Sequence, residues 1–351
     1  MPHIAVLTSG GDSPGMNAAL RAIVKLAAAQ GVEVRGVELG YEGLMAGRFV
    51  TLSPRDVDAI GHMGGTVLGS ARSAAFRTPE GRALAARHLA GARALVVIGG
   101  NGSLAGAHAL GQECEVPILG VPASIDNDVG CTSTALGVDT ALNTIVEACD
   151  RISDTARAHR RAFVVEVMGR QCGYLAMAAS IAVGADACLI RERGKNEDQL
   201  VGELAELVRR SFDPQRAKLR VLVLKAEGVG VPTDRLVTRL QAIAEAELRG
   251  VEVRGVVLGH VVRGGNPSYL DRMIAGRLAA AAVDAALGGQ RDEMVAWQPW
   301  TPGGIPTEDP SVLRFPLARV LEETDRLLDG TSPVTRRRVK MMEAYAGVLA
   351  I

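Results

Sequence analysis

Aromatic residues are scarce in this sequence, where phenylalanine, tryptophan and tyrosine make up only 3% of 351 residues. Proteins that bind single-stranded nucleic acids stack the bases on aromatic side chains, so the composition argues against that class of function. The chain also lacks an excess of either charge, with 39 basic and 39 acidic residues. No global field attracts a polyanion, and any phosphate must be bound by local arginines and loop amides.

The sequence also lacks a predicted membrane span and a pattern of paired cysteines. Its first residues carry no basic segment typical of a signal peptide, and its most apolar later stretch, residues 175–190, is interrupted by Ser180 and Asp186. The cysteine spacing indicates neither disulfides nor a zinc site. The five cysteines are Cys114, Cys131, Cys149, Cys172 and Cys188. These features predict a cytoplasmic protein with free, mostly buried thiols.

The chain is longer than one ordinary domain, and its pattern predicts two α/β domains. Short β-branched runs alternate with stretches whose apolar residues lie three and four positions apart, which is typical of parallel sheets covered by helices. The predicted strands cover residues 4–7, 32–37, 95–98, 118–121, 163–167, 221–224 and 253–258. The predicted helices cover residues 18–29, 136–151, 200–208 and 236–248, and the second of these is expected to lead into the second domain.

Three loops at predicted strand ends carry residue types suited to phosphate chemistry. Glycine pairs stand at positions 10–11 and 99–100, and the run PASIDND at 122–128 places two carboxylates two positions apart. Each glycine pair alone is as consistent with a tight turn as with a phosphate loop, but glycines also let an anion approach backbone N–H groups. Ligands of open α/β sheets lie at the carboxyl ends of the strands. Neither glycine loop fits the dinucleotide fingerprint or the P-loop, so both of these nucleotide folds, and a dehydrogenase, are disfavoured.

Five segments, in order along the chain, closely resemble motifs of the bacterial-type 6-phosphofructokinases. They are LTSGGDSPGMNAA (7–19), GGTVLGSAR (64–72), PASIDND (122–128), VEVMGR (165–170) and LGHVVRGG (258–265). The resemblance implies two similar three-layer α/β domains with mainly parallel sheets and an active site in the cleft between them. It implies a larger nucleotide-binding domain of residues 1–138 and about 260–310, and a smaller sugar-phosphate-binding domain of about 139–259 and 311–351.

The same resemblance implies an activity. It is the Mg²⁺-dependent transfer of a phosphoryl group from ATP to the 1-hydroxyl of fructose 6-phosphate, which yields fructose 1,6-bisphosphate in glycolysis. It further implies a cytoplasmic, allosteric homotetramer with shared active sites, regulated by ADP or phosphoenolpyruvate. No nucleic acid or membrane partner is expected.

The residues of the family motifs carry roles over to this chain. Asp126 matches the catalytic base, which accepts the proton of the attacking hydroxyl, and Ser124 keeps a hydroxyl where the family usually has threonine. Arg170 is expected to act in both catalysis and sugar binding. The expected nucleotide contacts are Gly11, Tyr41, Arg72, Gly102 and Ser103, although a lone tyrosine is more often packing. The expected metal ligands are Asp128 and, more weakly, Asn101.

The sugar-phosphate side also matches the family residue by residue. Met168, Gly169 and Arg170 resemble a clamp at a strand end, and Glu227 resembles a carboxylate that accepts hydrogen bonds from sugar hydroxyls. His260 and Arg263 resemble the pair that binds the 6-phosphate, and an arginine fork suits phosphate oxygens. Alone, His260 would be interpreted as a core or helix-start histidine. Two further arginines, which the family's neighbouring subunit contributes to this phosphate, correspond to Arg161 and Arg254.

Two departures from the family pattern stand out. Asn101 replaces the usual aspartate of a Gly-Gly-Asp-Gly motif, and because Mg²⁺ prefers anionic oxygen ligands, the change predicts weakened rather than absent catalysis. In the expected effector pocket, Pro54 and Ser153 stand where arginines are usual, which predicts blunted or altered allostery. The remaining residues of that pocket are Arg21, Lys25, Asp186, Arg216 and Lys218.

Alternative functions remain open from the sequence. A regulatory paralogue would keep the sugar-phosphate site while Asn101 disables phosphoryl transfer, although Asp126, Arg72 and Arg170 are all retained. A pyrophosphate-dependent enzyme is disfavoured because Gly102 leaves room for the α-phosphate of ATP, whereas Ala123 matches neither donor pattern. The segment 335–340, TRRRVK, matches no motif and is predicted to be a solvated helix face or end.

Overall fold

The computed structural model of the chain describes residues 3–216, 218–248, 250–345 and 348. The chain divides into two compact units. The larger unit comprises Met1–Thr140 and Arg263–Asp329, and the smaller unit comprises Ala141–Val262 and Gly330–Ile351. The first crossing between the units falls within helix α5 (Val138–His159), and the second falls within a 3₁₀ helix, η3 (Gly259–Arg263).

The larger unit is built on an eight-stranded sheet with the order β11-β12-β10-β5-β4-β1-β2-β3. The pairs among β10, β5, β4, β1 and β2 are parallel, whereas β3, β11 and β12 pair antiparallel at the two edges. The strands are β1 (His3–Ser9), β2 (Glu33–Val37), β3 (Phe49–Leu52), β4 (Ala92–Gly99), β5 (Ile118–Pro122), β10 (Glu293–Trp297), β11 (Ile305–Pro306) and β12 (Val312–Pro316). The parallel centre brings the carboxyl ends of β1, β4 and β5 to one edge.

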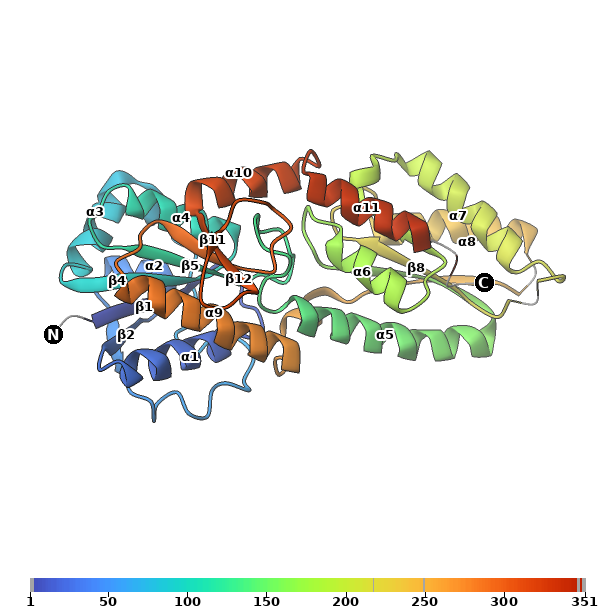
Figure 1. Cartoon of the computed structure of the whole chain (residues 1–351). Helices are drawn as coiled ribbons and strands as arrows, with labels where there is room; N and C mark the ends of the chain where they lie inside the picture. Colours follow the sequence, from blue (N-terminus) through green and yellow to red (C-terminus); the bar gives the residue numbers. More distant parts are fainter. Residues whose placement is uncertain (1–2, 217, 249, 346–347, 349–351) are drawn as a thin grey trace. The chain divides into compact units, whose positions relative to one another are not determined.

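Helices cover both faces of this sheet, so the larger unit has three layers (Figure 1). Alternate residues of β1 point to opposite faces: Ile4 and Val6 pack against α1 and α9, whereas Ala5 and Leu7 pack on the side of α2, α3, α4 and α10. The helices are α1 (Met16–Ala29), α2 (Gly40–Met45), α3 (Pro79–His88), α4 (Asn101–Gly111), α9 (Tyr269–Leu287) and α10 (Leu317–Leu328), with a short 3₁₀ helix η1 (Ala75–Arg77).

The smaller unit is built on a four-stranded, fully parallel sheet with the order β7-β8-β6-β9. Its strands are β6 (Arg161–Val167), β7 (Ala187–Leu189), β8 (Val221–Ala226) and β9 (Glu252–Val257). Its helices are α5 from Ala141 onward, α6 (Tyr174–Ala182), α7 (Glu197–Ser211), α8 (Thr233–Glu247) and α11 (Pro333–Tyr345), with a 3₁₀ helix η2 (Arg191–Arg193). All six residues of β8 are buried, as expected for a central strand covered on both faces.

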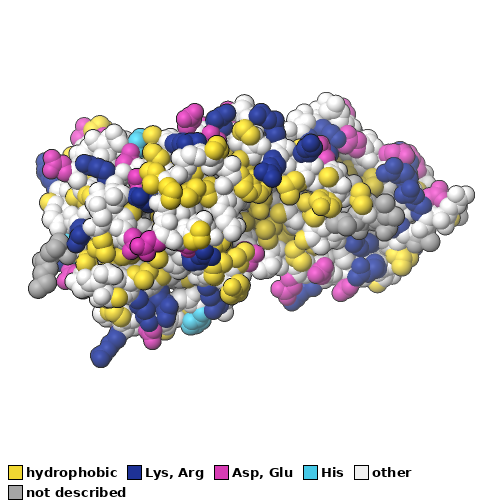
Figure 2. Space-filling model, viewed as in Figure 1, with side chains coloured by type: hydrophobic (Ala, Val, Ile, Leu, Met, Phe, Trp, Pro, Cys, Tyr) yellow, Lys and Arg dark blue, Asp and Glu magenta, His cyan; other side chains and the backbone are white. Residues whose placement is uncertain are grey.

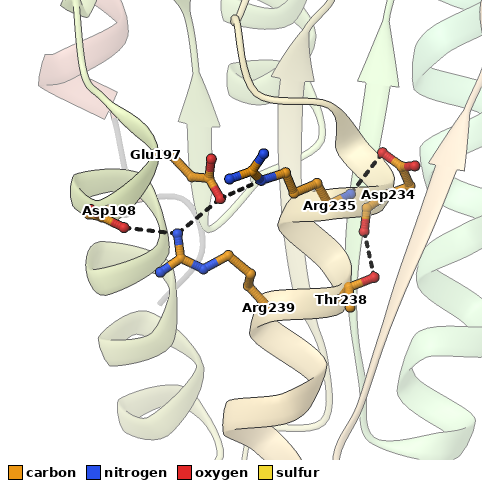
Figure 3. A network of polar contacts seen from close by, with 6 residues as sticks. All are labelled: Glu197, Asp198, Asp234, Arg235, Thr238 and Arg239. Atoms are coloured by element: carbon orange, nitrogen blue, oxygen red, sulfur yellow. Dashed lines mark hydrogen bonds and ion pairs between the residues drawn. The ribbon is translucent and has the colours of Figure 1, made fainter.

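Surface charges link the helices of the smaller unit. Figure 3 shows that Arg235 and Arg239 of α8 reach Glu197 of α7 at 2.8 and 2.9 Å, and that Arg239 also reaches Asp198 at 2.9 Å. On the face drawn in Figure 2, basic and acidic side chains are interspersed. On that face, no broad surface of one sign is seen.

Most of the predicted secondary structure is confirmed, and one domain boundary is wrong. Each predicted strand and helix overlaps an observed element of the same type. Residues 311–329, however, belong to the larger unit rather than the smaller one. The reason is that β12 pairs with β10 in the eight-stranded sheet, and α10 follows it and packs in the core on one face of that sheet. The crossing back to the smaller unit therefore comes at residue 330.

The C-terminal basic segment is only partly a solvated helix face. It lies on α11, where Arg336, Arg337 and Lys340 are exposed but Arg338 is buried. The Arg338 guanidinium lies 4.4 Å from the centre of the Tyr174 ring, which is a cation–π geometry. The prediction is therefore wrong for Arg338, because this arginine packs α11 against α6.

The cysteines agree with the expectation of free, mostly buried thiols. All five cysteines are free, and four of them are buried. Burial raises the pKa of Cys149 and of Cys188 to about 12, so both are unreactive packing residues. Within the described residues, no helix has both the length and the apolar character that crossing a membrane requires.

Candidate active site

The loop that carries the predicted base, residues 122–128, leaves β5 in a fixed conformation, and we call it the catalytic loop. Ala123 forms a bridge with Leu136, and the Ser124 N–H donates to the Leu136 carbonyl at 3.1 Å. Asn127 adopts a left-handed conformation (φ 52°), which asparagine tolerates better than most residues. Its side chain donates to the Ser133 carbonyl at 3.0 Å and accepts from the Ala135 N–H at 3.1 Å. Asn127 therefore braces the loop between the two predicted functional carboxylates.

Asp126, the predicted base, is buried beside a cation. It is only 3% exposed, and its Oδ1 lies 3.8 Å from Nη2 of Arg263. Arg263 also donates to the Asp12 carbonyl at 3.2 Å. A Cβ on Gly11 would lie only 2.7 Å from Nη1 of Arg263, so the glycine lets the loop after β1 approach this arginine. The larger unit thus brings Asp126, Gly11 and Arg263 together.

Asp128 lies next to Asn101, and both of its carboxylate oxygens accept hydrogen bonds. Asn101 Nδ2 donates to Oδ2 at 2.9 Å, and the Ser124 hydroxyl donates to Oδ1 at 3.0 Å. Asn101 Oδ1 in turn accepts from the Gly102 N–H at 2.8 Å. In place of a second carboxylate, this chain therefore puts an amide donor against Asp128.

This oxygen-rich group suits a magnesium ion that is carried mainly by a nucleotide. Among the described residues, no three or more histidine, cysteine, aspartate or glutamate side chains form a metal cluster. Mg²⁺ commonly uses only one or two carboxylates and completes its shell with waters and substrate phosphates. Asp128 and the amide oxygen of Asn101 fit that pattern.

The two glycine loops lie against each other beside the N-terminus of α4. A Cβ on Gly99 would lie 2.6 Å from the Ser9 carbonyl oxygen and from Cβ of Ser103, and one on Gly10 would lie 2.9 Å from the Ser103 hydroxyl. Ser103 is therefore buried under these turns rather than open to a ligand. Gly102 differs, since it is exposed and no atom lies within 4 Å of the position of an added Cβ. Open space is present where a nucleotide is expected.

Tyr41 supports the glycine loops from inside the core. Its ring stacks on Phe76 with centroids 3.9 Å apart, and its hydroxyl donates to the Ser103 carbonyl at 2.6 Å. The residue is 5% exposed, and burial raises its pKa above the ordinary value. The ring therefore packs beneath the loop that is expected to contact the nucleotide, and the expectation that Tyr41 packs near the nucleotide stays a prediction. Arg72, also expected at the nucleotide, is exposed a few residues before η1.

The smaller unit assembles a second group of predicted residues at the carboxyl ends of β6 and β8. We call Met168, Gly169, Arg170 and Glu227 the sugar clamp. One carboxylate oxygen of Glu227 accepts from the Gly169 N–H at 3.2 Å and from the Arg170 N–H at 3.0 Å. Gly169 has φ 145°, and a Cβ there would lie 2.6 Å from the Cys172 carbonyl oxygen. Glycine is required for this turn because other residues rarely adopt such a φ.

The predicted phosphate ligands of the smaller unit lie on β6, β9 and η3. His260 is exposed on η3. Arg161 Nε and Arg254 Nη2 donate to the same oxygen of Glu252, at 2.8 and 2.9 Å. These two guanidinium groups, first Arg254 and then Arg161, lower the pKa of Glu252. The sequence did not single out Glu252, because a glutamate in a strand carries no local signal of a cross-strand partner such as Arg161.

The predicted effector residues form one ion-paired group in each unit. In the larger unit, Lys25 and Arg21 contact Asp58, and the hydrogen bond from Lys25 is the main cause that lowers the pKa of Asp58. In the smaller unit, Lys218 contacts the buried Asp186. Arg216 is exposed. In the structure, Asp58 and Asp186 therefore pair with cations that an effector phosphate would need to contact.

A pocket of about 250 Å³ in the smaller unit lies apart from the sugar clamp. It is bordered by β7, α7 and Met342 of α11, and of the predicted site residues only Asp186 reaches it. Four leucines line it, together with the charged residues Asp186, Arg193, Lys195, Glu203 and Arg210.

The comparisons with known proteins agree with this geometry. The family model described as Phosphofructokinase matches residues 3–286, which is most of the chain. The chain belongs to the phosphofructokinase family. It is 45% identical over 301 residues to the ATP-dependent 6-phosphofructokinase of Thermotoga petrophila, covering 85% of this chain and 90% of the relative. It is 46% identical over 300 residues to the enzyme of the same name from Brevibacillus brevis, with the same coverage of 85% and 90%.

Solved structures of the phosphofructokinase family share the fold. Saccharomyces cerevisiae phosphofructokinase matches with a TM-score of 0.80 and 34% identity over 100% of this chain. This chain spans 48% of that yeast chain, about half its length. The resemblance stated from the five sequence motifs is therefore confirmed, and with it the two α/β domains.

Proposed function

We propose that this protein is an ATP-dependent 6-phosphofructokinase that converts fructose 6-phosphate to fructose 1,6-bisphosphate in glycolysis. The relatives at about 45% identity carry the name ATP-dependent 6-phosphofructokinase. The observation that carries the proposal is the buried Asp126, on a braced loop at the end of β5 and 3.8 Å from Arg263. A carboxylate at the carboxyl end of a central parallel strand is well placed to act on a bound substrate.

In the proposed reaction, Asp126 accepts the proton of the sugar 1-hydroxyl while that oxygen attacks the γ-phosphorus of ATP. The bond between the γ-phosphorus and the bridging oxygen breaks, and ADP leaves with the electron pair. Phosphoryl transfer of this kind depends mainly on positioning and on stabilisation of charge. Exposed Arg72, the amides around Gly11 and the hydroxyl of Ser124 provide groups for the phosphates, and Arg170 contributes from the smaller unit.

The sugar clamp and the arginines provide the acceptor side of the proposal. The Glu227 carboxylate is oriented by two backbone N–H groups that bond one of its oxygens, and the residue is exposed. Its other oxygen can therefore accept hydrogen bonds from sugar hydroxyls. His260 and Arg263 are assigned to the 6-phosphate. Arg161 and Arg254 are assigned to the same phosphate in a neighbouring subunit. This assignment makes the protein a homotetramer with shared sites.

We assign the metal and the donor from the same loops. Mg²⁺ would be held by Asp128 and, through a water, by Asn101, and when bound it neutralises charge on the transferred phosphates. The open space at Gly102 supports ATP rather than pyrophosphate as donor. Because Asn101 donates to Asp128, metal affinity is expected to be weaker than with an aspartate at that position.

Regulation and location complete the proposal. The paired acids in both effector groups, together with Pro54 and Ser153 in place of arginines, support weak or altered control by ADP or phosphoenolpyruvate. Five free thiols suit the reducing cytoplasm. Sigmoidal fructose 6-phosphate kinetics that ADP sharply relieves would contradict the regulatory part alone.

A coupled assay of the purified protein tests the central proposal. Fructose 6-phosphate is supplied with ATP or with pyrophosphate, each with and without Mg²⁺. We expect fructose 1,6-bisphosphate to form only with ATP and Mg²⁺. Product with pyrophosphate alone would reassign the donor. Binding of fructose 6-phosphate without turnover would favour the regulatory paralogue, the alternative that the Asn101–Asp128 hydrogen bond supports.

A further inference from the structure

A lysine is buried in the central strand of the smaller sheet, where the neighbouring residues are apolar. Lys225 on β8 is 1% exposed and is among the largest fully buried side chains of the described residues. Its neighbours on the strand include Leu222, Val223 and Leu224. Burying a charge costs free energy unless the charge is paired. Packing alone therefore does not explain a lysine at this position.

The partner of Lys225 lies directly across on β6. Lys225 and Glu166 are register partners in the parallel pair, and Lys225 Nζ lies 2.9 Å from Glu166 Oε2. The same carboxylate oxygen accepts a short hydrogen bond from the hydroxyl of Thr233, the first residue of α8. The contact therefore joins β6, β8 and the N-terminus of α8 at one point.

This ion pair lies immediately before the sugar clamp on both strands. Gly169 comes three residues after Glu166, and Glu227 comes two residues after Lys225. Between them, the Glu227 N–H donates to the Val167 carbonyl at 2.9 Å, and the Glu227 carboxylate then accepts from the N–H groups of Gly169 and Arg170. A shift of β8 along β6 would move Glu227 away from both N–H groups.

Stability alone does not account for the pair. Replacing a buried ion pair by apolar residues of similar size is often neutral or stabilising, whereas removing one partner is strongly destabilising. A strand as buried as β8 would accept a leucine or methionine at this position. What the pair adds is a directional contact, which aligns two strands at the point where they end.

From these contacts we propose that Lys225 and Glu166 are positioning residues that set the register of β6 against β8 and thereby hold the sugar clamp in its binding geometry. The inference rests on the proposed function, because it assigns the clamp to fructose 6-phosphate. Neither residue touches the substrate; each acts through Glu227 and the backbone of residues 169–170.

The test compares three full-length proteins: the unaltered chain, Lys225→Met, and the double variant Glu166→Gln/Lys225→Met. Methionine keeps the length of the lysine stem, and glutamine keeps an acceptor for Thr233. In Lys225→Met an uncompensated carboxylate remains beside the clamp, and we expect KM and Kd for fructose 6-phosphate to rise roughly ten- to hundredfold, because small displacements in a site have effects of that size. KM for ATP should stay the same, and the double variant should recover most of the loss.

Arg314→Met is the matched control. Arg314 and Glu293 form an ion pair between β12 and β10 of the larger unit, with side chains 16% and 14% exposed, and neither is a predicted site residue. It should lower thermal stability without changing KM for fructose 6-phosphate. If Lys225→Met lowers stability but leaves the sugar-phosphate affinity unchanged, or if the double variant is no better than the single one, the positioning role is overturned.

Binding of fructose 6-phosphate to the unaltered chain, measured by calorimetry, separates the two levels of inference. If the unaltered protein does not bind it, the proposed function fails, and this inference with it. If the unaltered protein binds it and Lys225→Met binds it equally well, only the inference fails.

Discussion

The catalytic loop of the larger unit and the sugar clamp of the smaller unit are supported in opposite ways. In the loop, the bracing residue is Asn127, whose side chain bonds backbone atoms at 3.0 and 3.1 Å, while its neighbour Asp126 is the predicted base. In the clamp, Glu227 is both brace and predicted ligand, because it bonds the backbone N–H groups of Gly169 and Arg170. In the catalytic loop, one residue braces the backbone and another is the predicted base, whereas in the sugar clamp Glu227 has both the bracing role and the predicted binding role.

The comparison predicts that a change at Asp126 acts on the chemical step alone. Asp126→Asn keeps the size of the side chain but removes the proton acceptor, so kcat should fall roughly 10²- to 10⁴-fold. KM for both substrates should change little, since the loop remains braced by Asn127. Steady-state kinetics with each substrate varied measures this. Asp284→Asn on α9, outside the site, is the control, and turnover that survives Asp126→Asn would remove this residue as the base.

Glu227→Gln should act on binding and on local structure together. The amide cannot make the charge-assisted hydrogen bonds that the carboxylate forms with two N–H groups, each worth about 1.5–3 kcal/mol. KM for fructose 6-phosphate should therefore rise by about ten- to hundredfold. Protection of the Gly169 and Arg170 amides against hydrogen exchange should fall in parallel. A rise in KM with unchanged amide protection would mean that Glu227 does not brace the clamp, and the contrast between the two regions would be lost.

Asn101→Asp tests how the catalytic loop handles metal. The new carboxylate would face Asp128, where Asn101 Nδ2 now lies 2.9 Å from Oδ2, and two adjacent carboxylates repel each other unless a cation lies between them. We expect lower thermal stability without Mg²⁺, stabilisation by Mg²⁺, and roughly tenfold higher activity at limiting Mg²⁺. Melting curves with and without Mg²⁺ give a readout that is independent of activity. If neither activity nor Mg²⁺ dependence changes, the assignment of this site is wrong.

Tyr41→Phe tests whether Tyr41 supports the loop of the larger unit or binds the nucleotide. It removes only the hydroxyl that donates to the Ser103 carbonyl, so the free energy of unfolding should fall by about 0.5–1.5 kcal/mol. KM for ATP should change less than twofold, because the ring lies beneath the loop. Urea unfolding and ATP kinetics on the same sample give both values. A selective rise in KM for ATP would show that Tyr41 contacts the nucleotide, as the family resemblance implies.

The smallest expected effect is a pH dependence near the first crossing between the units. Asp271 accepts hydrogen bonds from Gly137 and Thr140, but burial outweighs these bonds and raises its pKa above the ordinary 3.8. The folded protein therefore holds this proton at pH values where the unfolded chain has lost it, and stability falls as pH rises from 3.8 through the raised pKa. Asp271→Asn should flatten that slope in denaturant titrations at several pH values. If the slope does not change, other acids cause the pH dependence of stability.

The secondary structure that the sequence failed to predict follows from weak local patterns. Helix α4 contains Gly102, Gly106 and Gly111, and glycine disfavours helices. Helix α9 is rich in alanine on all sides, so it shows no clear amphipathic stripe. The edge strand β11 has only two residues, too few for a periodic signal. Each of these elements is stabilised by its place in the larger unit.

The sequence alone determined the alternation of strands and helices, the family, and the loops that carry Asp126, Asp128 and the clamp, because these depend on local residue order and on motifs. Only the tertiary structure decided which partners meet: Asn101 with Asp128, Arg263 with Asp126, Glu252 with two arginines, and Lys225 with Glu166. Except for Glu252 with Arg254, which share β9, these contacts join residues from different strands and loops. Their partners are set by sheet order and register, which no local pattern encodes.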